Sequence, residues 1–243
     1  MEAIKEKLIE WAKEYNSTSF IENDPIQFPR KYREMQDDAE ISGLLTALIS
    51  FGNRKQIIKK ADELDKMFKG NPFYWIANGE FFDDIPYNND SFYRTITNKR
   101  MIDWCVSIRR MITKCGTIEN YLMTEDTPID KTHETLSNIM GFSPKSANKR
   151  IAMFMRWMVR DDGIVDLGLW RRMSSKDLII PLDTHVHKMA LELGITKRKT
   201  TDLKTAMEIT DYMKSVFPDD SLLGDFALFG YGVNRGKEDG NAL

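Results

Sequence analysis

Apolar residues recur every three or four positions along most of the chain, which is the period of a helix with one buried face. The segments with this pattern are 2–15, 38–51, 55–69, 98–115, 132–140, 202–217 and 221–229, the last of them ended by Gly230 and Gly232. Residues 16–30 contain Pro25 and Pro29 and predict a loop. The sequence carries no β-hairpin signal, so we expect an all-α fold.

A tight turn is predicted directly after the helix at 132–140. Gly141 ends that helix, since glycine adopts the left-handed conformation without a side-chain penalty. Ser143 suits an N-cap and Pro144 the first helical position, so the next helix is expected to begin there, with Lys145 in its first turn. Free backbone N–H groups at a helix start favour anions, which makes this turn a candidate phosphate site.

The helix after this turn carries basic residues on one side and apolar residues on the other. At about 100° per residue, the basic arc consists of Lys145, Lys149, Arg156 and Arg160, and residues 141–160 contain no acid. Together with the basic outer side of the helix at 98–115, this arc is a candidate phosphate-tracking surface. A charged helix face is also typical of simple solvation.

A second turn precedes another predicted helix. Pro181 prevents the apolar run before it from continuing as a helix. The spacing of apolar residues then predicts a helix from Thr184 to Gly194, with Asp183 as its N-cap. Asp183 has a purely structural interpretation, because an N-cap alone is worth about 1 kcal/mol. Lys145 has one as well, because most lysines are simply exposed to solvent.

The two turns together resemble those of a known family. The sequence Gly-Phe-Ser-Pro-Lys-Ser-Ala at 141–147 is followed by Leu-Asp-Thr-His-Val at 182–186. In this order the two motifs are similar to those of the helix-hairpin-helix superfamily of base-excision DNA glycosylases. Residues 44–50 more loosely resemble the early barrel helix of that superfamily. The whole chain looks like a bacterial branch of it that has no iron–sulfur cluster.

The resemblance implies a DNA repair glycosylase that excises a damaged base and then cleaves the strand as an AP lyase. Lys145 matches the lysine nucleophile of the family, and Asp183 matches its aspartate. As the bond between sugar and base breaks, an ionised carboxylate stabilises the positive sugar and a neutral amine attacks it. The residues placed against DNA are Gly141, Ser143, Ser146, Lys149, His185, Asn53 and Arg54, of which the last two also fit a plain polar loop.

Four aromatic residues are weaker candidates for a base pocket. Phe142, Trp104, Trp157 and Trp170 have rings suited to stacking on an everted base, although such rings also fill hydrophobic cores. The implied partner is double-stranded DNA that contains a damaged base. An oxidised purine such as 8-oxoguanine is the substrate that analogy offers.

The fold of the family implies a helical barrel over residues 36–150 that ends in the hairpin. Residues 1–35 and 151–243 would form a second helical lobe, with the active cleft between the two. The interval between the two catalytic candidates is longer than in common members. Residues 161–176 are therefore expected to fold out as a loop or a short helix.

Two departures from the family pattern bear on phosphate binding and on cofactors. Ser143 stands where the second hairpin glycine is expected, and Pro144 has no backbone N–H to offer a phosphate. The chain has two cysteines, too few for the four-cysteine cluster of some members, so we expect no cofactor. Cys105 and Cys115 are separated by about 15 Å of rise along one predicted helix, which is too far for a disulfide.

Composition sets the remaining bounds. The 243 residues carry a net charge of −2, so any nucleic-acid surface must be local. No apolar stretch approaches the ~20 residues of a membrane helix, and the charged N-terminus is unlike a signal peptide. With reduced thiols, these features predict a cytoplasmic protein that needs no membrane and no obligate protein partner.

Two other classes of function stay open on the sequence. Asp183, His185 and His187 have the residue types of a metal hydrolase, but on a helix start His187 would point away from His185, so we expect no metal site. The second alternative is a non-catalytic helix-hairpin-helix protein that binds DNA without cleaving it. Such a protein would bind duplex DNA with a strong dependence on salt.

Overall fold

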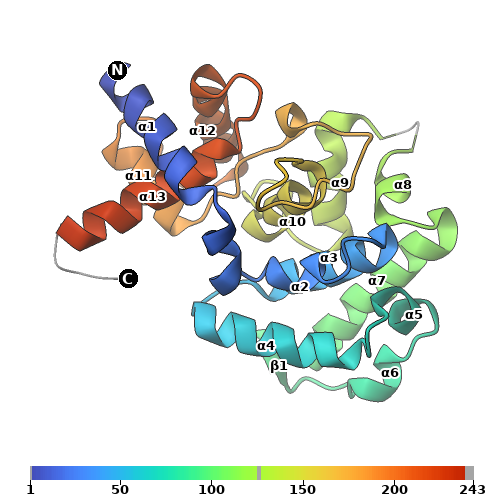
Figure 1. The fold of residues 1–243 in the computed structure, drawn as a ribbon. Coiled ribbons are helices and arrows are strands. Elements are labelled where there is room, and N and C mark those ends of the chain that lie inside the picture. The colour runs from blue at the N-terminus through green and yellow to red at the C-terminus, as the bar shows by residue number, and fades with distance from the viewer. Residues whose placement is uncertain (1, 125–126, 239–243) are drawn as a thin grey trace.

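The computed structural model describes residues 2–124 and 127–238, and it consists mainly of helices (Figure 1). The longer helices are α1 (Glu2–Tyr15), α3 (Gln36–Ile49), α4 (Arg54–Met67), α7 (Asn98–Cys115), α9 (Thr132–Ile139), α10 (Lys149–Val159), α11 (Thr184–Glu192), α12 (Leu203–Val216) and α13 (Leu223–Glu238). The shorter ones are η1 (Thr18–Asn23), α2 (Gln27–Arg30), α5 (Pro72–Ala77), α6 (Phe81–Asp84), α8 (Ile118–Leu122), η2 (Ile129–Lys131) and η3 (Ser175–Asp177). The predicted helical class is confirmed. Within the described residues, no helix is both long enough and apolar enough to cross a bilayer.

A small antiparallel ribbon corrects the expectation that the chain has no β-hairpin. Strands β1 (Ser91–Tyr93) and β2 (Ile96–Thr97) pair with each other just before α7. Arg94, in the turn between them, has a φ of +52°. Strands of three and two residues are too short to show an alternation of apolar and polar positions, so the sequence pattern could not reveal them.

The segment expected to be a loop, residues 16–30, contains two short helices, η1 and α2. Pro29 lies inside α2, and its side chain is buried. A helix of four residues presents too few positions for the 3.6-residue period to be recognised. The loop expectation was therefore wrong in detail, although this segment does separate α1 from the helices that follow.

Helix α13 extends past the two glycines that were expected to end it. Gly230 and Gly232 lie within α13, whose last residue is Glu238. A side chain at Gly230 would collide with the ring of Tyr15 in α1, and one at Gly232 would collide with the imidazole of His185. The expected end was wrong, because these glycines permit close helix packing, and that packing offsets their low helix propensity.

Apolar side chains gather into two hydrophobic clusters. The first is built mainly from the chain between α2 and residue 178, and the second joins α1 to α11, α12 and α13. In Figure 1 these last four helices lie together on one side of the molecule, away from α4 to α7. This division differs from the predicted one at residue 150. Ile151, Phe154 and Trp157 of α10 are fully buried in the first cluster, so α10 belongs with the helices that precede it.

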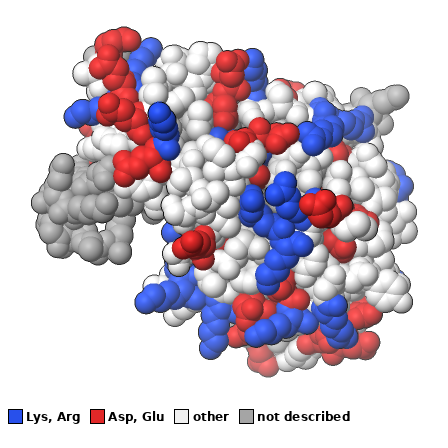
Figure 2. All heavy atoms as spheres, viewed as in Figure 1, with Lys and Arg blue, Asp and Glu red and all other residues white. Residues whose placement is uncertain are grey.

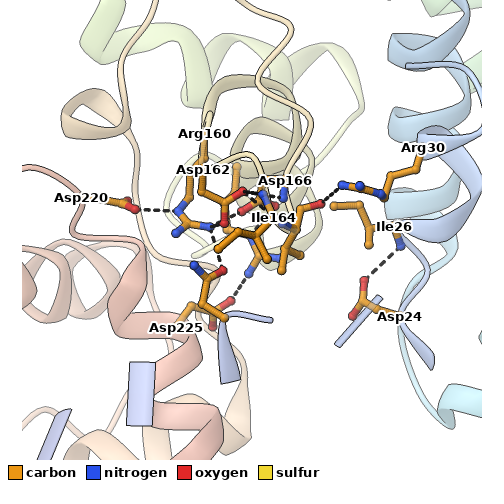
Figure 3. Close-up of polar contacts among 12 residues, drawn as sticks. Asp24, Ile26, Arg30, Arg160, Asp162, Ile164, Asp166, Asp220 and Asp225 are labelled. Carbon is orange, nitrogen blue, oxygen red and sulfur yellow. Dashed lines mark hydrogen bonds and ion pairs between the residues drawn. The ribbon is translucent and has the colours of Figure 1, made fainter. Parts of the chain in front are cut away.

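Two arginines, Arg156 of α10 and Arg160 at its C-cap, are buried in a network of ion pairs, of which Figure 3 shows the contacts of Arg160. The Nη1 atom of Arg160 lies 2.6 Å from Asp162 and 2.8 Å from Asp166, and its Nε lies 2.7 Å from Asp220. The side chain of Arg160 is 2% exposed and that of Asp166 is not exposed at all. Two charges removed from water require close pairing of this kind, since an unpaired buried charge is strongly unfavourable.

Arg156 occupies the neighbouring position in the same network. Its Nε lies 3.2 Å from Asp166, and its Nη1 pairs with Asp225 of α13. These contacts correct the expected basic arc, because Arg156 and Arg160 point into the protein and not toward a ligand. The acids that turn them inward come from residues 161–166 and from the C-terminal part of the chain, which no pattern within α10 indicates.

Loss of one acid from this network should be costly. We expect Asp166→Asn to lower the free energy of unfolding by about 3–5 kcal/mol, because two buried guanidiniums would lose a shared carboxylate. Urea unfolding monitored by circular dichroism measures the change. The control is Lys214→Gln, which breaks an exposed pair with Asp211 on α12 and should leave the unfolding midpoint unchanged. Equal midpoints for Asp166→Asn and the unmodified protein would contradict the stabilising role of the network.

Residues 161–176 do not fold out from the molecule as expected. Trp170 is 2% exposed, and its indole donates a 2.7 Å hydrogen bond to Glu40 of α3. The N–H groups of Arg171 and Arg172 donate to Glu119 of α8 at 2.7 and 2.9 Å. The segment is irregular, as predicted, but two buried carboxylates fasten it to the first hydrophobic cluster.

The Glu40 carboxylate accepts four hydrogen bonds in the interior. Its donors are the side chains of Gln36 and Trp170 and the backbone N–H groups of Ile118 and Glu119. Burial raises the pKa of Glu40 to about 7, although these donors favour the ionised form. The folded protein therefore binds this proton more tightly than the unfolded chain does. The resulting stability is fully present below the unfolded value of 4.5 and is lost as the pH rises to about 7.

Substitution of Glu40 should remove this pH dependence. One pKa unit corresponds to about 1.4 kcal/mol, so the Glu40 contribution should fall by about 3 kcal/mol across this pH window. We expect Glu40→Gln to be less stable at every pH, since its amide N–H faces N–H donors, but to lack this component of the slope. Urea unfolding of both proteins at several pH values between 4.5 and 8 measures the difference. Parallel pH profiles would contradict the assignment to Glu40.

Candidate functional site

The predicted capping role of Asp183 is confirmed. Its Oδ1 accepts a 2.8 Å hydrogen bond from the N–H of Val186, in the first turn of α11. Helix α11 ends at Glu192, and Gly194 follows with a φ of +68°, close to the predicted end. The cap uses one carboxylate oxygen, so the other, Oδ2, remains for a second partner.

The turn after α9 differs from the prediction at its second half. Gly141 has a φ of +70° and ends the helix as predicted. Helix α10, however, begins only at Lys149, after Asn148 in the left-handed conformation. Ser143 is therefore not an N-cap, and Pro144 is not the first helical residue. The side chain of Asn148 donates a 2.8 Å hydrogen bond to the Ser143 carbonyl, which closes an extra turn before the helix.

The predicted phosphate site at this turn is partly occupied by internal hydrogen bonds. The N–H of Lys145 lies 3.4 Å from Ser143 Oγ, and the N–H of Ser146 donates to the Ser143 carbonyl at 3.1 Å. The turn is also joined to α12, since the N–H of Leu203 donates to the Lys145 carbonyl and Ser146 pairs with Asp202. These bonds hold the turn in place but leave it fewer N–H groups for an anion.

An ion pair joins the two turns. Lys149 Nζ lies 2.9 Å from Asp183 Oδ2, and the two side chains are 37% and 33% exposed. Burial opposes ionisation of Asp183, but the Lys149 ammonium and the Val186 N–H outweigh it, so the pKa of Asp183 is lower than usual. The carboxylate is therefore ionised at neutral pH, and it lies within reach of solvent.

Lys145 does not make the contact expected of it. Its side chain is exposed, and no ion pair or hydrogen bond involves its amine within the part of the chain that the structure describes. The amine that contacts Asp183 belongs instead to Lys149, four residues later. The difference follows from the late start of α10, since Lys149 and not Lys145 occupies the first helical position.

The buried network of α10 extends to this ion pair through Asp225. Asp225 pairs with Arg156 (Figure 3) and is also influenced by the charges of Lys149 and Asp183. Burial raises its pKa to about 6, against the lowering effect of the two cations. The charges of the Lys149–Asp183 pair therefore act on the buried network through space, without a direct contact with Asp225 among the described residues.

The two histidines of α11 have structural surroundings. The Nε2 atom of His185 is buried against Gly232 of α13 without a hydrogen-bond partner among the described residues, although the residue is partly exposed. His187 Nε2 lies 2.7 Å from the carbonyl of Arg198. Among the described residues, no three His, Cys, Asp or Glu side chains are grouped as metal ligands.

Asn53 and Arg54 lie at the start of α4. Asn53 caps that helix by accepting a 3.3 Å hydrogen bond from the N–H of Gln56. The guanidinium of Arg54 lies 5.7 Å from the ring centre of Phe229, which belongs to α13. Arg54 therefore reaches from the first group of helices to the second, and it lies at the junction where a DNA-binding cleft was predicted.

Of the four aromatic candidates, the three tryptophans are buried and Phe142 is partly exposed. Trp157 and Trp170 are 0% and 2% exposed in the core, so they are unavailable to a base, and their assignment was wrong. Trp104 is also buried, and its indole donates a 2.9 Å hydrogen bond to the Met140 carbonyl. Phe142 lies 6.0 Å from Trp104 between ring centres and is half-buried. Of the four rings, Phe142 alone has an accessible edge.

The surroundings of Phe142 contain residues that the sequence pattern did not reveal. Arg150 of α10 lies between Phe142 and Phe51, with its guanidinium 4.6 and 5.1 Å from the two ring centres. Phe51 was expected only as an apolar position at the end of a helix. These residues come from separate parts of the chain, so no local spacing connects them.

Two surface hollows and the distribution of surface charge bear on where a ligand could bind. Two surface hollows of about 300 and 500 Å³ are lined by residues around Thr127 and Arg109, and neither includes Lys145, Lys149 or Asp183. Figure 2 shows acidic and basic side chains interspersed over one face of the molecule. This agrees with the small net charge of −2, so any surface that binds a polyanion there must be local.

The two roles of the Asp183 carboxylate can be separated by substitution. We expect Asp183→Ala to lower the free energy of unfolding by about 1 kcal/mol, because the N-cap of α11 is lost. Asp183→Asn should cost much less, because asparagine caps a helix as well as aspartate does. Urea unfolding of the two variants beside the unmodified protein measures both. Equal losses would show that the ion pair, and not the cap, carries the contribution of Asp183.

Comparison with known proteins places the chain in a family. A family model described as "Protein of unknown function (DUF2400)" matches residues 24–234, which include both turns and all helices from α2 to α12. No curated protein and no solved structure matches the chain. Because the match covers most of the chain, the protein belongs to the family described as Protein of unknown function (DUF2400).

Proposed function

We propose that this protein is a DNA repair glycosylase that excises a damaged base from double-stranded DNA and then acts as an AP lyase. The observation that carries the proposal is the 2.9 Å contact between Lys149 and Asp183. It brings the start of α10, directly after the motif at 141–147, against the motif at 182–186, and these two motifs carry most of the resemblance to the helix-hairpin-helix glycosylases. The two hydrophobic clusters, with these segments where they meet, fit the two-lobed fold of that superfamily.

Asp183 has the properties that base excision requires of a carboxylate. Its lowered pKa keeps it ionised, and its capping bond to Val186 fixes its position. As the bond between sugar C1′ and the base breaks, positive charge develops on the sugar. A fixed carboxylate beside that charge stabilises the transition state without reorganisation.

The two lysines, Lys145 and Lys149, have different roles in the proposed reaction. A lysine attacks only as a neutral amine, and pairing with a carboxylate favours its charged form. Lys149 is so paired, whereas the amine of Lys145 is exposed and has no carboxylate partner among the described residues. In the proposal Lys149 holds Asp183, and Lys145 attacks C1′ as the base leaves. The Schiff base that results then permits β-elimination of the strand.

A non-catalytic DNA-binding protein is the second candidate. It is favoured by one observation, namely that Lys145 makes no contact with Asp183 and lies outside α10. Under this alternative the turn would still bind duplex DNA, with affinity that decreases as salt concentration rises. The two candidates differ in one respect that can be measured, which is the covalent intermediate.

Borohydride trapping on duplexes that carry an abasic site or a single damaged base tests the proposal. The unmodified protein should form a covalent adduct, because borohydride reduces the Schiff base. Lys145→Gln should form none, and Lys149→Gln should retain a weaker signal. Asp183→Asn should slow base release by about 10²–10³-fold, the range for removing one preorganised electrostatic group. A panel of lesions that includes 8-oxoguanine identifies the base.

The outcomes separate the two candidates. Absence of any adduct, with retained duplex binding, would favour the non-catalytic protein. An adduct that persists in Lys145→Gln and disappears in Lys149→Gln would transfer the nucleophile to Lys149. Lys204→Gln is the matched control and should trap like the unmodified protein. Lys204 is an exposed lysine of α12 outside both motifs, and it follows Leu203, whose N–H donates to the Lys145 carbonyl.

A further inference from the structure

Arginines and aromatic rings alternate beside the turn after α9. The guanidinium of Arg94 lies 5.6 Å from the ring centre of Phe51, and that of Arg150 lies 5.1 Å from the same ring. Arg150 also lies 4.6 Å from Phe142, which is 6.0 Å from Trp104, and Arg100 lies 5.4 Å from Trp104. We call this set the arginine–aromatic row; its members are Arg94, Phe51, Arg150, Phe142, Trp104 and Arg100.

Backbone contacts fix the row in place. Arg100 donates to the carbonyls of Met140 and Gly141, both at 3.0 Å, and Arg150 donates to that of Leu48 at 2.7 Å. Gly141 has a φ of +70°, and a side chain there would lie 2.7 Å from the Arg100 guanidinium, so it would strain the backbone and displace Arg100. The row is therefore ordered without a ligand, and a ligand that stacked on it would lose little affinity to the ordering of side chains.

The three arginines of the row lack carboxylate partners. Arg94, Arg100 and Arg150 make no ion pair among the described residues, and they donate hydrogen bonds to an amide oxygen and to backbone carbonyls. Burial, and then the positive charge of Arg100, lowers the pKa of Arg150. Arg156 and Arg160, by contrast, are compensated by four acids. Three uncompensated guanidiniums close together favour an anionic ligand.

We propose that the arginine–aromatic row binds an unpaired stretch of DNA, with its bases stacked on the half-buried rings of Phe51 and Phe142 and its phosphates held by the guanidiniums. Stacking on an aromatic ring accepts any base, and arginine binds phosphate in a bidentate manner. An acidic peptide would use the charges but would leave Phe51 and Phe142 without a partner. This site deepens the proposed function, on which the choice of DNA over another polyanion rests. Eversion of a base leaves that nucleotide and the one opposite it unpaired.

Two oligomers distinguish stacking from charge. One is a twelve-residue single-stranded oligothymidylate, and the other has the same phosphates with tetrahydrofuran in place of every base. We expect the first to bind more tightly in fluorescence anisotropy. Phe51→Leu and Phe142→Leu should each weaken binding of the base-bearing oligomer about tenfold, the lower part of the range for loss of one stacking ring. Neither should change binding of the base-free oligomer.

Matched variants control for charge and for general surface effects. Arg150→Lys keeps the charge but loses the planar face, so it should weaken the base-bearing oligomer more than the base-free one. Tyr87→Leu removes an exposed ring that lies 5.5 Å from Lys99, outside the row, and should change neither. Circular dichroism checks that each variant folds. If Phe142→Leu does not fold, Phe51→Leu and Arg150→Lys still carry the test.

Equal affinity for the two oligomers, or unchanged affinity in both phenylalanine variants, would overturn the site. An equal loss in Tyr87→Leu would also overturn it. Binding of either oligomer requires no chemical step, so it is measured independently of base excision. Borohydride trapping without base-dependent binding would therefore refute the site alone. Base-dependent binding without trapping would refute the enzymatic proposal and leave the site standing.

Discussion

Two guanidiniums in the interior, those of Arg156 and Arg160, depend on carboxylates from three separate parts of the chain. Asp162 and Asp166 come from the segment after α10, Asp220 from the turn before α13, and Asp225 from α13 itself. Because a buried charge without its partner is strongly unfavourable, α10 can adopt its position only when the C-terminal helices are in theirs. The network therefore fixes the two hydrophobic clusters relative to each other, and with them the two turns of the candidate site.

The candidate site depends on this arrangement in a direct way. Lys149 begins α10, and Asp183 caps α11, so their ion pair joins a helix of the first cluster to a helix of the second. Asp225 lies between the network and this pair and is influenced by both. Burial would favour the neutral form of Asp183, but the ammonium and the capping N–H keep it ionised. The Lys149–Asp183 ion pair thus both joins the two groups of helices and keeps Asp183 ionised for the proposed reaction.

The protein contains two sets of arginines, one paired with carboxylates and one without carboxylate partners among the described residues. Arg156 and Arg160 are inside and fully compensated, which is a structural use of the guanidinium group. Arg94, Arg100 and Arg150 stack on rings and bond to neutral oxygens, which leaves their charge available to an external anion. The distinction lies in where the acids are, since residues 141–160 contain none and the compensating ones arrive from elsewhere. A net charge of −2 conceals this local contrast.

The sequence by itself determined the helical class, most of the longer helices, and the features that depend on neighbouring residues. Gly141 ends α9 and Asp183 caps α11 as predicted, because a left-handed glycine and a capping carboxylate act within one turn. Tertiary structure alone decided which lysine contacts Asp183, since the two turns meet only in the folded protein. It also turned Arg156 inward and carried α13 past Gly230. Each of these depends on contacts between side chains that lie far apart in the sequence. Periodicity and capping rules describe only neighbouring residues, so they cannot predict such contacts.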